Sequence, residues 1–351
     1  MSIQCRLIGF LLAVTLPIFA NAATRSDLGQ CVGIASDSER LACYDRISGR
    51  METAPTEAKA TTDTPVPPSH ATPAVVASST PEANLTPMQK AWDLAGTRGH
   101  EFEIRPYRAV YLLPLFTTSN VNSTPSSPTR QSTEVDGIRA TEAKFQLSFK
   151  TKAATDLFGD NGDLWLAYTQ SSRWQVYSEK ISRPFRETDY EPEAIFVWRT
   201  NQRIAGVDVR YVGLGLNHQS NGRGGELSRS WNRVIAQAGF EMGDWTATLR
   251  RWHRIGESDS KDDNPNIEKY LGRGEIELTR KIGSNLLMAR MHHPLIGSGG
   301  DKGSLRVDWA FPISKGLRGH LQWFTGYGES LIDYNHKADY IGLGFSLVEP
   351  L

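Results

Sequence analysis

Three residues near the middle of the chain have side chains and a spacing that suit acyl transfer. His218 and Ser220 stand two positions apart at the end of an alternating apolar segment, and Asn232 follows a glycine-rich stretch. Residues i and i+2 of a β-strand share one face, so the histidine and the serine are predicted neighbours. Leu214 and Leu216 share that face. A candidate nucleophile and its base therefore lie on the hydrophobic side of a strand.

A β-hairpin centred on Gly225 would add the third residue. In that register His218 lies opposite Asn232, and Ser220 lies opposite Ser230. Directly opposed residues of an antiparallel pair have Cβ atoms about 5 Å apart and point to the same side. The hairpin therefore predicts that His218, Ser220 and Asn232 converge.

This trio suits nucleophilic catalysis. Ser220 Oγ would attack a carbonyl, His218 would take its proton, and Asn232 Oδ1 would orient the imidazole. The backbone N–H of Gly222 is a candidate oxyanion donor. The alternative is that His218 and Ser220 are only hydrogen-bonding groups of a loop. Polar groups that face hydrocarbon are costly and are usually functional, which favours catalysis.

The rest of the chain reads as many short strands. The sequence contains 31 glycines and nine tryptophans, and regular spacing of roughly a dozen alternating segments is typical of a barrel or a sandwich. The expected strands are 107–115, 143–151, 162–178, 193–200, 206–219, 229–241, 245–256, 270–281, 285–293, 303–312, 317–325 and 339–348.

The connections between these strands are of two kinds. Short turns are expected at 242–244, 283–284 and 313–316, and long loops at 116–142, 179–192, 257–269, 294–302 and 326–337. Short turns at one end and long loops at the other are typical of an outer-membrane barrel, with apolar residues outward and polar residues inward. Alternation alone would also fit a soluble sandwich. The tryptophans Trp245, Trp252 and Trp323 are candidates for an aromatic girdle.

The first 88 residues have a different character. An apolar run after Arg6 ends in Ala-Asn-Ala, which favours an export signal over a membrane anchor, because the run is short for spanning a bilayer. Cys31 and Cys43 are expected to form a disulfide rather than a metal site. The predicted divisions are a signal peptide at 1–22, a small Cys-pair helical hairpin at 23–50, a disordered Pro/Ala/Thr-rich linker at 51–88 and the barrel at 89–351. The formal net charge of zero gives no reason to expect nucleic acid as a partner.

The segment N-H-Q-S-N-G-R at 217–223, followed by S-R-S-W-N-R, resembles the signature of the outer membrane phospholipase A family. The resemblance extends from about residue 102 to the C-terminus and does not cover the Cys hairpin or the linker. Further matching segments are S-R-P-F-R-E-T at 182–188, Y-E-P at 190–192, D-D-N-P at 262–265 and G-Y-G-E-S-L-I-D-Y-N at 326–335.

The resemblance implies a twelve-stranded antiparallel transmembrane β-barrel in the outer membrane, with the N-terminal hairpin in the periplasm. It implies hydrolysis of acyl esters of phospholipids and lysophospholipids, at the A1 and A2 positions, by a homodimer that requires Ca²⁺. The triad maps to His218, Ser220 and Asn232, and the oxyanion amide maps to Gly222. Gln170, which shares a face with Leu164, Leu166 and Tyr168, matches the family's dimer-interface glutamine.

The resemblance also implies calcium ligands: the Arg223 carbonyl, Ser228 and, from the partner subunit, Ser182. Hydroxyl and carbonyl oxygens suit this hard cation. A second calcium site of the family would use Asp263 and a carboxylate at the position of Gly225, and Glu226 next door is a candidate substitute. The alternatives are a non-enzymatic pore or adhesin barrel and a membrane protease. A protease lacks the acidic residues expected near its histidine.

Overall fold

The computed structural model describes two separate units of the chain, residues Met1–Val75 and Val76–Leu351. The described residues are 31–34, 36–47, 85–95, 101–258, 260–293 and 302–348. In the first unit, helix α2 (Asp37–Ile47) carries Cys43, which is joined to Cys31 by a disulfide with the Cα atoms 5.7 Å apart. The predicted signal peptide lies outside the described residues.

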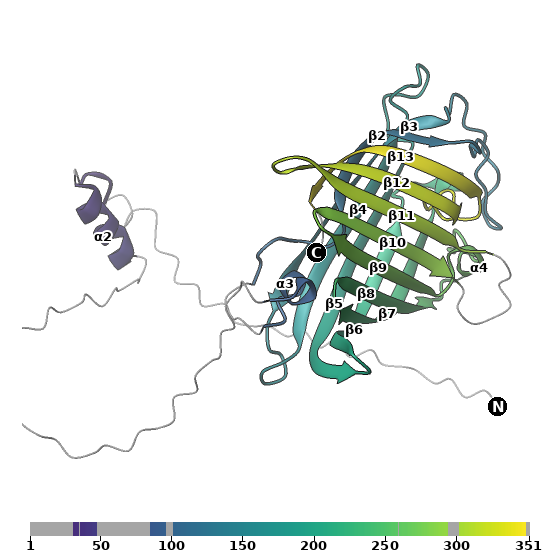
Figure 1. Cartoon of the computed structure of the whole chain (residues 1–351). Helices are drawn as coiled ribbons and strands as arrows, with labels where there is room; N and C mark the ends of the chain where they lie inside the picture. The colour runs from purple at the N-terminus through teal and green to yellow at the C-terminus, as the bar shows by residue number, and fades with distance from the viewer. Residues whose placement is uncertain are drawn as a thin grey trace, which may run out of the picture. The chain divides into compact units, whose positions relative to one another are not determined.

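Twelve antiparallel strands of the second unit close into a barrel (Figure 1). Each strand pairs with its neighbours in sequence, and β13 returns to pair with β2. The strands are β2 (Val110–Thr118), β3 (Thr141–Ala154), β4 (Asp163–Trp174), β5 (Glu187–Ile204), β6 (Val207–Ser220), β7 (Ser230–Met242), β8 (Trp245–Ile255), β9 (Gly274–Ile282), β10 (Asn285–His293), β11 (Ser304–Ser314), β12 (Leu317–Tyr327) and β13 (Lys337–Val348). The predicted twelve-stranded barrel is confirmed.

A few shorter elements accompany the barrel. A two-residue strand, β1 (Arg105–Pro106), pairs with β3, and the remaining elements are α3 (Pro87–Ala91), the 3-10 turn η2 (Gly225–Leu227) and α4 (Glu268–Leu271). Among the described residues, no helix is both long enough and apolar enough to cross a membrane.

Several strand boundaries differ from the prediction, and those at the starts of β5 and β9 differ most. Strand β5 starts at Glu187, so the loop predicted at 179–192 ends earlier, and Pro192 lies within the strand opposite Tyr168. Strand β9 starts at Gly274 rather than at residue 270, because α4 and Gly272, with φ of 71°, precede it. The first error assigned strand residues to a loop, and the second assigned loop residues to a strand.

The connections alternate as predicted. Four turns contain two residues each, and the turn between β5 and β6 is Ala205–Gly206 with φ of 50° and 85°. Positive φ at both central residues is the conformation whose twist matches that of the flanking strands. The loops at the other end are long, and one of them carries α4. Short turns therefore lie at one end of the barrel and the candidate site loops at the other.

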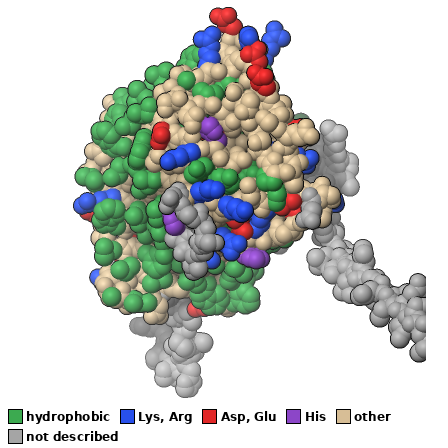
Figure 2. Space-filling view, turned by 90° about the vertical axis from the view of Figure 1, so that its right-hand side faces the viewer, with side chains coloured by type: hydrophobic (Ala, Val, Ile, Leu, Met, Phe, Trp, Pro, Cys, Tyr) green, Lys and Arg blue, Asp and Glu red, His purple; other side chains and the backbone are tan. Residues whose placement is uncertain are grey.

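The barrel is apolar outside and polar inside. Along β6, Leu214 and Leu216 are 56% and 60% exposed, whereas Arg233 and Gln237 of β7 are buried inside. Figure 2 shows the contrast on one face, with hydrophobic side chains along the left flank and Lys and Arg near the middle. The prediction that Trp252 belongs to an aromatic girdle is wrong. Trp252 is buried and packs on Trp231, with ring centroids 6.1 Å apart.

Ion pairs fill the lumen. Glu191 accepts from Arg233 at 2.9 Å and lies 3.4 Å from Arg108, and Glu193 pairs with Arg250. Buried charges are tolerated only where they are paired and hydrogen-bonded. These pairs make the lumen a packed polar core.

Helix α3 packs against the inner face of the barrel at the end opposite α4 (Figure 1). Thr86 caps this helix, and the Met88 N–H donates to Glu241 at 2.8 Å. The Trp92 ring packs on Tyr211, and the Lys150 ammonium lies 3.5 Å from the centroid of the Trp92 ring. The boundary predicted at residue 88 between linker and barrel therefore falls inside α3.

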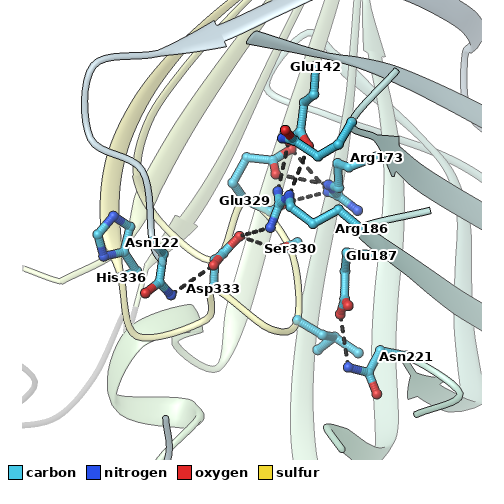
Figure 3. A network of polar contacts seen from close by, with 12 residues as sticks. Asn122, Glu142, Arg173, Arg186, Glu187, Asn221, Glu329, Ser330, Asp333 and His336 are labelled. Atoms are coloured by element: carbon cyan, nitrogen blue, oxygen red, sulfur yellow. Dashed lines mark hydrogen bonds and ion pairs between the residues drawn. The ribbon is translucent and has the colours of Figure 1, made fainter. Parts of the chain in front are cut away.

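The loop between β12 and β13 folds into the mouth of the barrel at the other end (Figure 3). Its Glu329 pairs with Arg173 at 2.9 Å, and its Asp333 pairs with Arg186 at 3.0 Å. Arg186 also bonds Glu142 of β3 at 2.8 Å. The G-Y-G-E-S-L-I-D-Y-N segment thus ties the loops to the strands around the mouth.

We expect the Glu329 contacts to make the stability of the barrel pH-dependent. Burial on its own would raise the pKa of Glu329, but the positive charges of Arg173 and Lys144 outweigh it and lower the pKa to about 2. Because the folded-state pKa lies below the ordinary value of 4.5, the stabilisation is complete above pH 4.5 and is lost as the pH falls through 2.

Glu329→Gln should therefore lower the free energy of unfolding by about 3 kcal/mol at pH 7, with a smaller difference from wild type in acid. Urea unfolding in lipid vesicles at several pH values measures both. Glu103→Gln, at an exposed ion pair, is the control. A difference that stays constant with pH would contradict the expectation.

Candidate active site

The β6–β7 hairpin has the register predicted from the sequence. His218 pairs with Asn232 and Ser220 pairs with Ser230. Asn232 Oδ1 lies 2.8 Å from His218 Nδ1, so the amide oxygen accepts the imidazole N–H. This tautomer leaves His218 Nε2 unprotonated and able to accept a proton from a hydroxyl.

The three side chains lie on the outer face of the barrel near its long-loop end. His218 is exposed and follows Leu214 and Leu216 on that face, while Ser220 is half-buried. Ser220 Oγ makes no hydrogen bond to another described residue. The three side chains therefore face the lipid side of the barrel rather than the lumen.

The loop after Ser220 is held by Asn221, a residue of the N-H-Q-S-N-G-R segment to which the sequence assigned no role. Its Nδ2 donates to Glu187 Oε1 at 2.9 Å and to the Leu227 carbonyl at 2.8 Å (Figure 3). Its Oδ1 accepts from the N–H groups of Arg229, at 3.0 Å, and Arg223, at 3.3 Å. One buried side chain therefore fixes both ends of the loop.

The backbone of Gly222, the predicted oxyanion donor, has an N–H that is unbonded in the described part of the chain. Its φ is 64°, which favours glycine, and within the described chain its N–H has no hydrogen-bond acceptor. A Cβ at this position would lie 2.9 Å from the Tyr190 ring. A side chain at position 222 would clash with that ring, so the packing requires glycine two residues after Ser220.

The three predicted calcium ligands have oxygens that are available. Trp174 Nε1 donates to the Ser182 carbonyl at 2.6 Å, and within the described chain the Ser182 hydroxyl has no partner. Among described residues, the Arg223 carbonyl accepts no hydrogen bond. The Ser228 hydroxyl donates to Asp263 at 2.5 Å, which leaves its lone pairs for a cation. These oxygens fit Ca²⁺.

The predicted second calcium site does not fit. Both oxygens of Asp263 already accept hydrogen bonds, one from Nε of the positively charged Arg130 at 3.0 Å and the other from the Ser228 hydroxyl. The carboxylate of Glu226 accepts the Gln131 N–H. The Asp263 carboxylate raises the pKa of the Arg130 guanidinium, as expected for a stable ion pair. The β2–β3 loop therefore supplies a positive charge where a second cation was expected.

Gln170 lies on the outer face of β4, as its spacing predicted. It is half-buried, like its neighbour Tyr168, whose hydroxyl donates to Gln170 Oε1 at 3.1 Å. Gln170 Nε2 donates to Ser172 Oγ at 3.2 Å. A row of hydrogen-bonding groups thus crosses an otherwise apolar face.

A family model described as phospholipase A1 matches residues 88–347. The chain belongs to this family. A protein of Neisseria meningitidis serogroup B is 36% identical over 349 residues, which cover 90% of this chain and 89% of that protein. The family assignment makes this barrel a phospholipase.

Two solved structures are similar to this chain. One is the Salmonella typhi outer membrane phospholipase dimer with bound calcium, with a TM-score of 0.64 and 33% identity over 74% of this chain and 98% of that chain. Another is an outer membrane phospholipase A from Escherichia coli, an active-site mutant with alanine in place of asparagine. Its TM-score is 0.64, with 32% identity over 74% of this chain and 98% of that chain.

We expect Asn221→Ala to lower the rate of phospholipid hydrolysis by about 10- to 100-fold, because the loop that carries Gly222 loses its central brace. Hydrolysis in detergent micelles and the heat-modifiable gel migration of the folded barrel should be measured together. Asn285→Ala, at the start of β10 at the opposite end of the barrel, is the control. An unchanged rate in Asn221→Ala would show that the loop is held by other contacts.

Proposed function

We propose that this phospholipase hydrolyses acyl esters of membrane phospholipids and lysophospholipids with a Ser220–His218–Asn232 triad. The observation that carries the proposal is the 2.8 Å hydrogen bond between Asn232 Oδ1 and His218 Nδ1, beside Ser220 on the outer face. The asparagine in the active site of the related E. coli enzyme supports the assignment of Asn232.

The reaction begins when Ser220 Oγ attacks the ester carbonyl and passes its proton to His218 Nε2. The resulting imidazolium is oriented by Asn232 and returns the proton to the leaving lysophospholipid oxygen. Water activated by the same imidazole then cleaves the acyl-enzyme and releases the fatty acid. Asn232 remains neutral throughout, which limits the charge placed beside lipid.

The Gly222 N–H is proposed to stabilise the tetrahedral oxyanion. Ca²⁺ would be held by the Arg223 carbonyl, Ser228 and Ser182 of the partner subunit, and when bound would supply positive charge near the developing negative oxygen. Because Asp263 is already paired with Arg130, we propose one calcium for each active site.

The active form is proposed to be a homodimer in the outer membrane, with Gln170 in its interface. The calcium-bound dimer of the S. typhi relative supports this assembly. Hydrogen bonds between polar groups hold helices together in lipid, and the same reasoning applies to Gln170 on this barrel. The N-terminal unit with the Cys31–Cys43 disulfide is proposed to lie in the periplasm.

Ser220→Ala should reduce phospholipid hydrolysis by about 10⁴-fold or more, since the acyl-enzyme cannot form. Fatty-acid release from vesicles measures the rate, and gel migration without heating verifies the folded barrel. Ser284→Ala, in a two-residue turn, is the matched control. Substantial hydrolysis by folded Ser220→Ala would refute the triad, and ion conductance without lipolysis would favour a pore.

Chelation of Ca²⁺ should abolish hydrolysis, and Ser228→Ala should raise the calcium concentration for half-maximal activity on the order of 10- to 100-fold. Titration by calorimetry should give one calcium for each active site of the dimer. Ser132→Ala, at an exposed loop serine, should leave the titration unchanged. Two calcium ions for each site would contradict the role given to Arg130.

A further inference from the structure

The Asn232 side chain is held from both sides. Its Oδ1 accepts from His218 Nδ1 at 2.8 Å, and its Nδ2 donates to Glu257 Oε1 at 3.0 Å. The second contact reaches a carboxylate that the sequence did not connect with the triad. Glu257 lies two residues beyond the end of β8, in the loop that leads to α4.

The fold places Glu257 beside Asn232 through two anchors. Ile255, the last residue of β8, pairs with Asn232 across the β7–β8 ladder. Further along the same loop, Asn264 Oδ1 accepts the Ser230 N–H at 3.0 Å. The loop is therefore tied to the start of β7 on both sides of Glu257, which is half-buried.

The contact has a chemical consequence because an amide has two different ends. If the Asn232 side chain turned by 180°, its NH₂ group would face the imidazole and its oxygen would face Glu257. A carboxylate only accepts hydrogen bonds, so that arrangement would set two acceptors against each other. Glu257 therefore favours the orientation in which Oδ1 faces His218.

The orientation of the amide in turn sets the tautomer of the histidine. With Oδ1 as acceptor, the imidazole proton stays on Nδ1 and the lone pair of Nε2 is free for the Ser220 proton. With NH₂ facing the ring, the opposite tautomer would be favoured and Nε2 could not act as a base.

We propose that Glu257 is a positioning residue of this phospholipase, which orients Asn232 and thereby keeps His218 in its catalytic tautomer. The proposal rests on the proposed function of the triad. It extends the hydrogen-bonded pair of His218 and Asn232 by a third member, Glu257. Glu257 touches neither the substrate nor the reacting atoms and acts only through the asparagine.

The test is a thermodynamic cycle of full-length variants, with kcat and KM measured on phospholipid in micelles. Glu257→Ala should lower kcat by about 10-fold with KM nearly unchanged. In an Asn232→Ala background, the same substitution should have no further effect, because the side chain through which it acts is gone. Glu257→Gln keeps an acceptor oxygen and should retain a rate within about 3-fold of wild type.

A second pair of variants tests the direction of the hydrogen bond. Asn232→Asp would place two carboxylates against each other, so activity should fall. Adding Glu257→Gln restores a donor opposite the new aspartate, and the double variant should be more active than Asn232→Asp alone. A merely structural role of Glu257 predicts no such recovery. Glu134→Ala, at an exposed loop glutamate, is the control.

The outcomes separate this inference from the proposed function. If Ser220→Ala is inactive and Asn232→Ala has a reduced but measurable kcat while Glu257→Ala matches wild type, only the role of Glu257 is wrong. If Glu257→Ala lowers kcat by the same factor with and without Asn232, it does not act through the asparagine. An active Ser220→Ala would overturn the triad itself. Gel migration without heating verifies that each variant is folded.

Discussion

The structure depends on one constraint: a backbone in lipid must satisfy every N–H and C=O group within the protein. A closed sheet meets this requirement because it has no unpaired edge, and the return of β13 to β2 completes it here. Closure then fixes which side chains face out. Each strand sends alternate residues to lipid and lumen, and many charged residues of the strands are buried inside as ion pairs.

This constraint makes the outward polar residues exceptional. His218 and Asn232 lie on an apolar face, where an unpaired polar group is expensive, and they satisfy each other. The loop that follows Ser220 is supported from within the barrel. Glu187 is buried at the start of β5 and holds Asn221, which braces the loop beside Ser220. The packed lumen thus gives rigidity to a site on the opposite surface of the same strands.

The sequence predicted the strands and the hairpin register because both follow from local alternation. The His218–Asn232 pairing needs only the periodicity of two strands and the centre of their turn. Contacts between loops were not predictable in this way. Asn221 with Glu187, Asp263 with Arg130 and Asn232 with Glu257 join segments whose distance is fixed by barrel closure and loop folding. The sequence alone did not explain why Gly225 stands where the family's second calcium site would have a carboxylate. The Arg130–Asp263 ion pair provides an explanation.

The position of Glu257 answers a problem that lipid creates for a histidine base. A carboxylate directly bonded to the imidazole would stabilise the imidazolium, but it would carry a full charge on the hydrocarbon-facing surface. In this barrel the residue that touches the ring is a neutral amide, and the carboxylate stands one hydrogen bond further away, in a loop beyond the end of β8. The free-energy cost of a charged side chain falls with its distance from the bilayer centre. An asparagine between the two groups therefore transmits the orienting effect of a carboxylate while the charge itself stays nearer to water.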